Sequence, residues 1–254
     1  MIKKLTIIFL LVLITIPVSH TYTTVIGTNS ASSCISIRMD NYCEWFYKKL
    51  GNEIPKPAYD VFKKALTGYF NLKAESKIGN NLLTIIDFSL SSSKERMWII
   101  DMVRMKITHR SLVSHGRNSG GEFAKTFSNR IASNQSSLGF YLTGGVYYGK
   151  NGFSLYLDGL EKGINDKARE RTIVMHSADY VSKEFIRRYG RLGRSLGCPA
   201  IPVKNHREII RSLSGRSCMF IYYPSPDYFG KSLMLNYENA FIPHMPFATR
   251  QGLR

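Results

Sequence analysis

The 254-residue sequence predicts a mainly β protein with flanking helices, folded as a β-sandwich or a curled mixed sheet. Several short apolar segments have the length and alternation of strands. Glycine-rich turns separate some of these segments, and 12% of the residues are aromatic, a class that favours strands. Hydrophobic residues make up 44% of the chain, which is enough for a sizeable core.

Residues 1–21 have the features of a secretory signal peptide. Lys3 and Lys4 precede an apolar stretch, Leu5–Val18, that is too short for a comfortable membrane span. No A-x-A cleavage pattern follows, so we place the expected cut near Ser19–Tyr22, with an uncleaved membrane anchor as the alternative. The sequence therefore predicts an exported protein of the periplasm or cell envelope.

The next segment, residues 22–56, is expected to hold a linker and one short helix. Ser and Thr are frequent over residues 21–38, and Asp40 is a candidate N-cap for a helix that follows. An apolar stripe at helical spacing over residues 58–69 predicts a second helix. We expect the main domain over residues 57–230 and an irregular tail over residues 231–254.

Within the main domain, strands and helices are expected in a mixed order. Turns are expected at Gly144-Gly145 and over residues 149–152, because both are rich in glycine. The expected strands are residues 83–88, 98–108, 138–142, 153–157, 172–176 and 219–223, and the expected helices are residues 181–188 and 205–213.

The formal net charge of +17 favours an anionic partner. Removal of the signal peptide takes away two lysines and leaves roughly +15. Anionic envelope polymers fit an exported protein better than nucleic acid does, and the chain has no recognisable nucleic-acid-binding motif. A charge that serves only solubility is the other interpretation. The oligomeric state stays open.

The four cysteines divide into three kinds. Cys34 and Cys43 are close in sequence, and oxidising conditions outside the cell make them candidates for a disulfide. Cys218 begins an apolar run and is expected to be a small buried hydrophobic residue. Cys198 has different sequence neighbours, and these make it a candidate reactive thiol.

Cys198 lies in a loop that reads Arg-Leu-Gly-Arg-Ser-Leu-Gly-Cys-Pro-Ala over residues 191–200. A reactive thiol needs partial exposure and a positive environment, and Arg191 and Arg194 provide positive charge nearby. Pro199 has no N–H, so donors to an oxyanion must come from the amides of Cys198, Gly197 or earlier residues.

A cysteine nucleophile needs a base, and histidine is the usual one. His176 ends the expected strand 172–176 next to a loop, where its ring can project into a site. His115 is a second candidate, because it lies in the polar, glycine-rich segment 114–120.

A metal site built from Cys198, His176 and either His115 or His206 is a competing hypothesis. These spacings match no zinc pattern, and neither C-x-x-C nor H-E-x-x-H is present. The sequence therefore predicts no metal and no cofactor.

The segment Ser195-Leu-Gly-Cys198, with His176 placed 22 residues upstream, resembles the catalytic signature of the YkuD-type murein L,D-transpeptidases. More specifically, the chain is similar to the divergent branch called the murein L,D-transpeptidase catalytic domain family. One departure is clear, because Leu196 occupies the place of histidine in the broader S/T-H-G-C motif. The resemblance covers residues 57–224 and is carried by residues 114–120, 127–129, 136–145, 157–161, 165–168, 174–181 and 190–202.

The resemblance implies a YkuD-like sheet with a catalytic cysteine loop and a cysteine acyltransferase acting on peptidoglycan stem tetrapeptides. His176 would take the proton of Cys198, and a thioester would pass to an amine or to water. These two outcomes correspond to an L,D-transpeptidase and an L,D-carboxypeptidase. Gly197 is expected at the oxyanion, and Ser195 is expected to orient His176 or contact substrate, with a simple turn residue as the alternative for Ser195.

Four further residues are expected to bind the substrate. The alternatives are a solvated loop charge for Arg194 and a core position for Tyr141. A non-catalytic peptidoglycan-binding envelope protein with a degenerate site is the competing function, and the Leu196 departure motivates it. The four expected substrate-binding residues are Arg194, His115, Ser119 and Tyr141.

Overall fold

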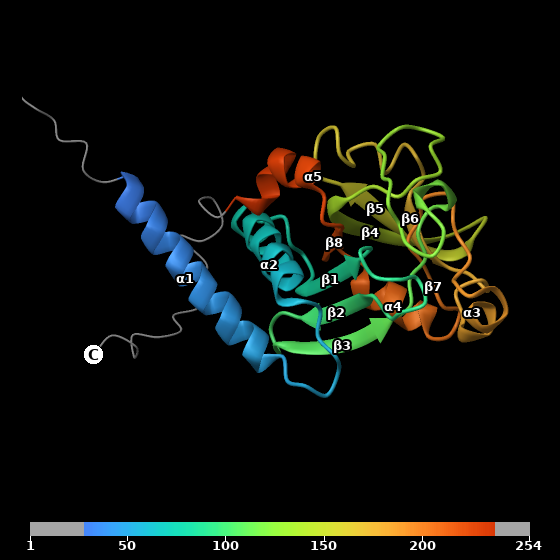
Figure 1. Cartoon of the computed structure of the whole chain (residues 1–254), viewed down its shortest axis with the longest axis horizontal. Helices are drawn as coiled ribbons and strands as arrows, with labels where there is room; N and C mark the ends of the chain where they lie inside the picture. The colour runs from blue at the N-terminus through green and yellow to red at the C-terminus, as the bar shows by residue number, and fades with distance from the viewer. Residues whose placement is uncertain (1–27, 237–254) are drawn as a thin grey trace, which may run out of the picture.

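The computed structural model describes the backbone of residues 28–236 and the side chains from residue 38 onward (Figure 1). The expected signal peptide and most of the expected tail lie outside the described residues. The helices are α1 (Thr28–Lys49), α2 (Tyr59–Ala74), η1 (Arg117–Ser119), α3 (Lys183–Tyr189), α4 (His206–Leu213), α5 (Pro226–Lys231) and η2 (Leu233–Leu235). None of the helices in this part of the chain is long and apolar enough to cross a membrane.

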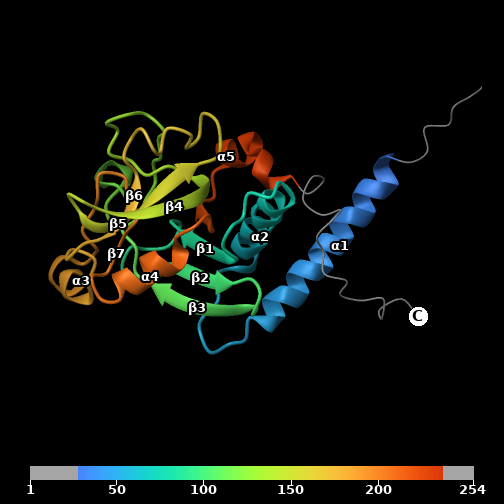
Figure 2. The same ribbon diagram turned by 180° about the vertical axis from the view of Figure 1, so that it is seen from behind.

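Eight strands form one mixed sheet in the order β3-β2-β1-β8-β4-β5-β6-β7 (Figures 1 and 2). Parallel pairing joins β1 to β8 and β6 to β7, and the other neighbours are antiparallel. The expected mainly β fold with flanking helices is therefore confirmed. The strands are β1 (Leu82–Asp87), β2 (Met97–Asp101), β3 (Lys106–Ser111), β4 (Gly139–Gly149), β5 (Gly152–Gly159), β6 (Val174–Ser177), β7 (Ala200–Ile201) and β8 (Cys218–Tyr222).

The first helix is longer than the sequence suggested. The backbone is helical from Thr28, within the segment expected to be a linker, and continues for 22 residues. No glycine or proline interrupts this stretch before Gly51, whose φ of +71° ends the helix. The buried C-terminal half of α1 packs on α2, with Phe46 against Phe62 at a ring separation of 5.7 Å, and this packing supports the helix.

The candidate disulfide between Cys34 and Cys43 is not formed. Both residues lie on α1, and Cys43 is a free, buried thiol. A separation of nine residues on a helix spans about 13 Å, well beyond the Cα distance that a disulfide bridges. Cys218, in contrast, is fully buried on β8, as expected.

One expected strand and one expected turn need correction. The segment 98–108 forms a hairpin rather than one strand, because the Asp101 carboxylate accepts hydrogen bonds from the N–H groups of Val103 and Arg104, at 3.0 and 2.9 Å, and turns the chain. The Gly144-Gly145 pair lies inside β4, at a register shift against β5, rather than in a turn. The turn expected over residues 149–152 does join β4 to β5.

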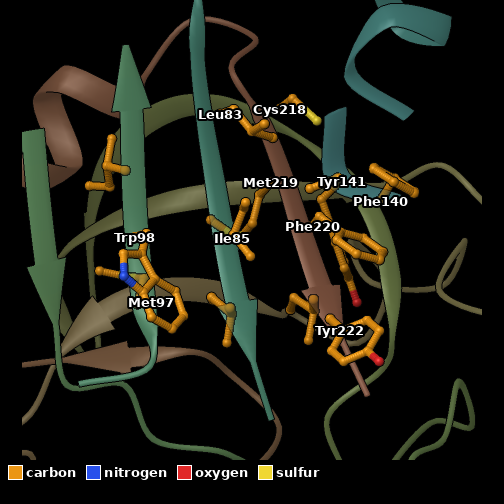
Figure 3. Close-up of a cluster of buried hydrophobic side chains, with 14 of the residues drawn as sticks. Leu83, Ile85, Met97, Trp98, Phe140, Tyr141, Cys218, Met219, Phe220 and Tyr222 are labelled. Atoms are coloured by element: carbon orange, nitrogen blue, oxygen red, sulfur yellow. The ribbon is translucent and has the colours of Figure 1, made fainter. Parts of the chain in front are cut away.

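The core lies between the sheet and α2, which contacts β1 and β8. Figure 3 shows side chains of neighbouring strands meeting there, with Phe140 of β4 beside Phe220 of β8. These two rings stack at 4.3 Å. Gly68 allows α2 to lie directly against the Phe140 ring, because a Cβ at that position would lie 2.2 Å from ring atoms of Phe140. The interior is close-packed here, so the helix and the sheet act as one rigid support.

A buried polar cluster fixes the start of β4. The Glu161 carboxylate accepts hydrogen bonds from the Phe140 N–H at 2.6 Å and the Tyr228 hydroxyl at 3.1 Å. The Asn165 amide donates to the carbonyls of Leu138 and Phe140 at 2.9 and 3.0 Å. This cluster therefore anchors the chain just after residues 128–137, the segment that supports the candidate site.

We predict that Gly159→Ala destabilises the fold by about 3 kcal/mol, because overpacking against backbone has little room to relax. A Cβ on Gly159 would lie 1.9 Å from the Asn165 carbonyl oxygen. Urea unfolding measures the loss. Gly145→Ala is the matched control, since nothing lies within 4 Å of its Cβ position. Equal midpoints for the two variants would contradict the prediction.

Candidate active site

Cys198 lies in the loop that enters β7, and His176 lies on the neighbouring strand β6 at the edge of the sheet. The parallel register sets His176 of β6 opposite Ala200 of β7, two residues after Cys198. The Cys198 side chain is 8% exposed. Its Sγ accepts from the Val174 N–H at 3.5 Å and donates to the Thr172 carbonyl at 3.7 Å. Among the described residues, no hydrogen bond joins Cys198 Sγ to the His176 ring in this resting arrangement.

Burial decides the protonation states of both groups. It raises the pKa of the Cys198 thiol, and the Val174 N–H and the charge of Arg171 oppose that rise. Burial also lowers the pKa of His176, against the opposing effect of the Ser177 carbonyl. Near neutral pH the site therefore holds a thiol and a neutral imidazole. His176 Nδ1 lies 3.0 Å from the Ser177 carbonyl, so Nδ1–H donates there and Nε2 remains as the base.

Ser195 closes the loop that carries the thiol. Its Oγ donates to the Cys198 carbonyl at 2.6 Å and accepts from the Gly197 N–H at 3.1 Å. Its backbone N–H donates to the His115 carbonyl at 3.0 Å. Both hydroxyl contacts are made inside the loop rather than to His176, so this geometry fits the turn role that was the alternative expectation.

Position 197 requires glycine, both for its backbone conformation and for the lack of space around it. Its φ is +126°, which favours glycine. A Cβ there would lie 2.8 Å from the Gln135 carbonyl and 2.9 Å from Ile173 Cδ1. The Gly197 N–H is occupied by Ser195 Oγ, and the Gly197 carbonyl accepts from Ser136 Oγ at 3.0 Å. In this conformation Gly197 therefore shapes the loop and offers no free amide to an oxyanion.

Arg171 is a residue of the site that sequence reasoning missed. Its Nη1 donates to the Ser128 carbonyl and to Ser137 Oγ, at 2.7 and 2.6 Å. Its Nη2 donates to the Gln135 carbonyl and to Ser133 Oγ, at 2.5 and 3.2 Å. One guanidinium thus holds residues 128–137 against the nucleophile loop and favours the thiolate of Cys198. Sequence offered no signal, because Arg171 is one of 35 basic residues.

His115 is buried beneath the loop that carries Cys198 and does not line the site. Its Nδ1 lies 2.8 Å from Arg96 Nη2, and Arg96 also donates to the carbonyls of Leu90 and Val113. Burial lowers the pKa of His115 to about 4 and the pKa of Arg96 to about 9. The ring is therefore neutral, and its 1% exposure leaves a substrate no surface to contact.

Of the other three residues expected to bind substrate, two are buried. Ser119 Oγ accepts from the Ser136 N–H at 2.9 Å, and the Tyr141 hydroxyl donates to the Ser137 carbonyl at 3.1 Å. Both side chains have 0% exposure, so they stabilise the interior and do not face a substrate in this conformation. Arg194 is exposed and holds the neighbouring turn through a hydrogen bond from Nη1 to the Gly120 carbonyl at 3.0 Å.

The outer surface of the loop carries Leu196, which is 62% exposed next to Cys198. An apolar side chain thus stands where the broader motif has histidine. Within residues 28–236, no group of three or more His, Cys, Asp and Glu side chains is arranged to hold a metal ion.

A family model described as the L,D-transpeptidase catalytic domain, YkuD_2, matches residues 53–222. No curated protein matches the chain. Solved structures with some similarity include an L,D-transpeptidase from Mycobacterium smegmatis, with 10% identity and a TM-score of 0.35 over 56% of this chain. Another is an L,D-transpeptidase (Yku) from Stackebrandtia nassauensis, with 12% identity and a TM-score of 0.34 over 72% of this chain and 77% of that one. The chain spans 59% of the length of the M. smegmatis protein.

We predict that alkylation of Cys198 by iodoacetamide continues to speed up with pH above about 8.5, the ordinary pKa of cysteine. Burial raises the pKa of this thiol, so the thiolate fraction grows only at higher pH. Peptide mapping after timed labelling measures the rate at this residue alone. Cys198→Ala supplies the background from the other three cysteines, Cys34, Cys43 and Cys218. A plateau at neutral pH would show a thiolate already formed.

We further predict that Arg171→Lys loosens residues 128–137 while the rest of the fold keeps its protection. Lysine retains the charge but cannot reproduce the planar fork that reaches four acceptors. Hydrogen exchange followed by mass spectrometry should show faster exchange in this segment. Arg188→Lys, on exposed α3, is the matched control. Unchanged exchange over residues 128–137 would contradict this prediction.

Proposed function

The chain belongs to the L,D-transpeptidase catalytic domain family, and from that membership we propose that it is a peptidoglycan-modifying cysteine acyltransferase. The observation that carries the proposal is the pairing of β6 with β7, which brings Cys198 and His176 to one sheet edge inside the matched region. The free Nε2 of a neutral His176 is suited to general-base chemistry.

The proposed first step forms a thioester. His176 Nε2 takes the thiol proton, and Cys198 Sγ attacks the carbonyl of the third residue of a stem tetrapeptide. The carbonyl electron pair moves to oxygen, where the Cys198 N–H is the available donor in the loop. The C–N bond then breaks, and terminal D-alanine leaves with the proton that His176 returns.

The second step resolves the thioester. An amine of a second stem attacks the acyl carbon and gives a cross-link, which is the L,D-transpeptidase outcome. Water in the same place gives a shortened stem, which is the L,D-carboxypeptidase outcome. In both cases His176 accepts the proton of the attacking group, and Cys198 leaves as the thiolate and is reprotonated.

A second candidate is a non-catalytic peptidoglycan-binding envelope protein. The observations that favour it are the raised pKa of a thiol that is nearly buried and the exposed Leu196 beside it. Export to the periplasm or cell envelope belongs to both proposals and rests on residues 1–21, outside the described residues. The net charge of +17 supports contact with anionic envelope polymers.

The decisive measurement is the intact mass of the mature protein after incubation with a stem tetrapeptide and, separately, with a carbapenem. We predict an acyl adduct on the wild type, with D-alanine released from the tetrapeptide, and none on Cys198→Ala. His176→Ala should slow acylation by about 100-fold or more, because it lacks the base. Wild-type protein that binds peptidoglycan but forms no adduct would favour the second candidate.

A further inference from the structure

The hairpin that joins β4 to β5 ends in a run of surface residues. All of residues 145–152 are half-buried or exposed. Val146 and Tyr148 of β4 are 40% and 66% exposed, although one side chain is aliphatic and the other aromatic. Side chains two residues apart on a strand point to the same face. These two side chains therefore form one exposed apolar strip along β4.

Two arginines of α4 border this strip. Arg207 and Arg211 are both exposed and lie four residues apart, so they share one face of the helix. The Arg207 guanidinium lies 5.9 Å from the ring centres of Tyr148 and Phe153. The Arg211 guanidinium lies 5.5 Å from the Phe153 ring centre. Lys150 adds a third exposed cation at the turn of the hairpin. We define the hairpin surface as Val146, Tyr148, Lys150, Arg207 and Arg211.

The three cations of the hairpin surface are not neutralised by nearby acids. Within residues 28–236, neither Lys150 nor either arginine of the surface forms an ion pair or a side-chain hydrogen bond. The acid of α4, Glu208, lies 3.8 Å from His109 instead. Three unpaired cations around two exposed apolar side chains are complementary to a surface that is both anionic and apolar.

An anionic lipid bilayer combines these two properties, because charged headgroups lie directly above the acyl chains. Tyrosine is favoured at the boundary between the two layers, and arginine reaches the phosphates while its stem lies on apolar groups. A soluble polyanion would pair with the cations, but it would not remove Val146 from water. Burial of Val146 and Tyr148 adds free energy only where acyl chains are within reach. The hairpin surface is therefore better suited to a bilayer than to a soluble polymer.

The hairpin surface and His176 lie on opposite faces of the sheet. Directly opposite residues of paired strands share a face, and the register sets Tyr148 opposite Phe153 and Leu155 opposite Met175. Phe153 and Leu155 are two residues apart on β5, so all four side chains share one face. His176 follows Met175 on β6 and points to the other face. A bilayer on the hairpin surface therefore leaves the face that carries His176 uncovered.

We propose that the hairpin surface docks the protein on an anionic lipid bilayer, with its two apolar side chains among the headgroups and its three cations on lipid phosphates. Such docking is reversible and sensitive to salt, because it depends mainly on charge. The proposal goes beyond the proposed function and does not depend on it, since docking uses neither Cys198 nor His176.

The first test is hydrogen exchange of the full chain with vesicles, followed by mass spectrometry. With an equal mixture of phosphatidylglycerol and phosphatidylcholine, exchange over residues 145–152 should slow by about fivefold or more, and high salt should reverse the effect. Phosphatidylcholine alone should have little effect. Because the measurement is local, binding through residues 1–21 would not protect the hairpin. Unchanged exchange over residues 145–152 with the mixed vesicles would overturn the proposal.

A pair of charge variants tests whether the position of the cations matters. Arg207→Gln combined with Arg211→Gln should lower the preference for mixed over neutral vesicles, measured by co-sedimentation, by about 25-fold, or about fivefold per charge. The matched control combines Lys49→Gln on α1 with Lys106→Gln on β3, two exposed cations elsewhere on the chain. This control loses the same charge and should stay within about twofold of the wild type. Equal losses in the two double variants would mean that binding follows net charge alone, and the hairpin surface would be rejected.

Tyr148→Ser separates a bilayer from a soluble polyanion. This variant should weaken protection of residues 145–152 by mixed vesicles by about fivefold, because it removes apolar area, and leave the affinity for polyphosphate within about twofold. Polyphosphate that protects the hairpin as strongly as vesicles do, in wild type and Tyr148→Ser alike, would assign the surface to an anionic polymer and refute bilayer docking. Cys198→Ala should dock like the wild type, so failure of the stem tetrapeptide to react leaves this proposal standing.

Discussion

Backbone pairing between two loops holds the candidate active site together. The Ser195 N–H donates to the His115 carbonyl, and the Ser195 carbonyl accepts from Arg117, so residues 114–117 run beside the nucleophile loop. The Ser114 N–H extends this pairing to β7 through the Ala200 carbonyl. Beneath it, Arg96 and His115 form a buried, neutral-histidine pair that fixes the 114–117 segment from inside. Movement of either loop would therefore displace the thiol.

Desolvation sets the chemistry of the resting site. Because Cys198 and His176 are both nearly buried, neither carries a charge near neutral pH, and the pair differs from a preformed thiolate–imidazolium ion pair. Such a thiol requires a base at the moment of attack. The charge of Arg171 nearby favours the thiolate that forms, while its hydrogen bonds hold the adjacent segment in place.

The loop has an inner and an outer surface with different roles. On the inner side, the Ser195 hydroxyl and the Gly197 N–H hydrogen-bond within the loop. Few backbone N–H groups of the loop therefore remain free to donate to a developing oxyanion. On the outer side, Leu196 and Arg194 are exposed, so this surface carries one apolar and one cationic side chain. This division explains how leucine can stand on the outer surface, in the place of the broader motif's histidine, without a change in the inner hydrogen bonds that hold the Cys198 loop.

Local sequence by itself determined most of the strands and the glycine-dependent loop that carries Cys198, because each depends on neighbours within a few residues. Only the tertiary structure decided which polar side chains face inward. Tyr141 and His115 look available in the sequence, yet the sheet and the loops bury them. Arg171 became part of the site because residues far apart in the chain converge on its guanidinium. Burial and convergence are non-local properties that no short pattern encodes.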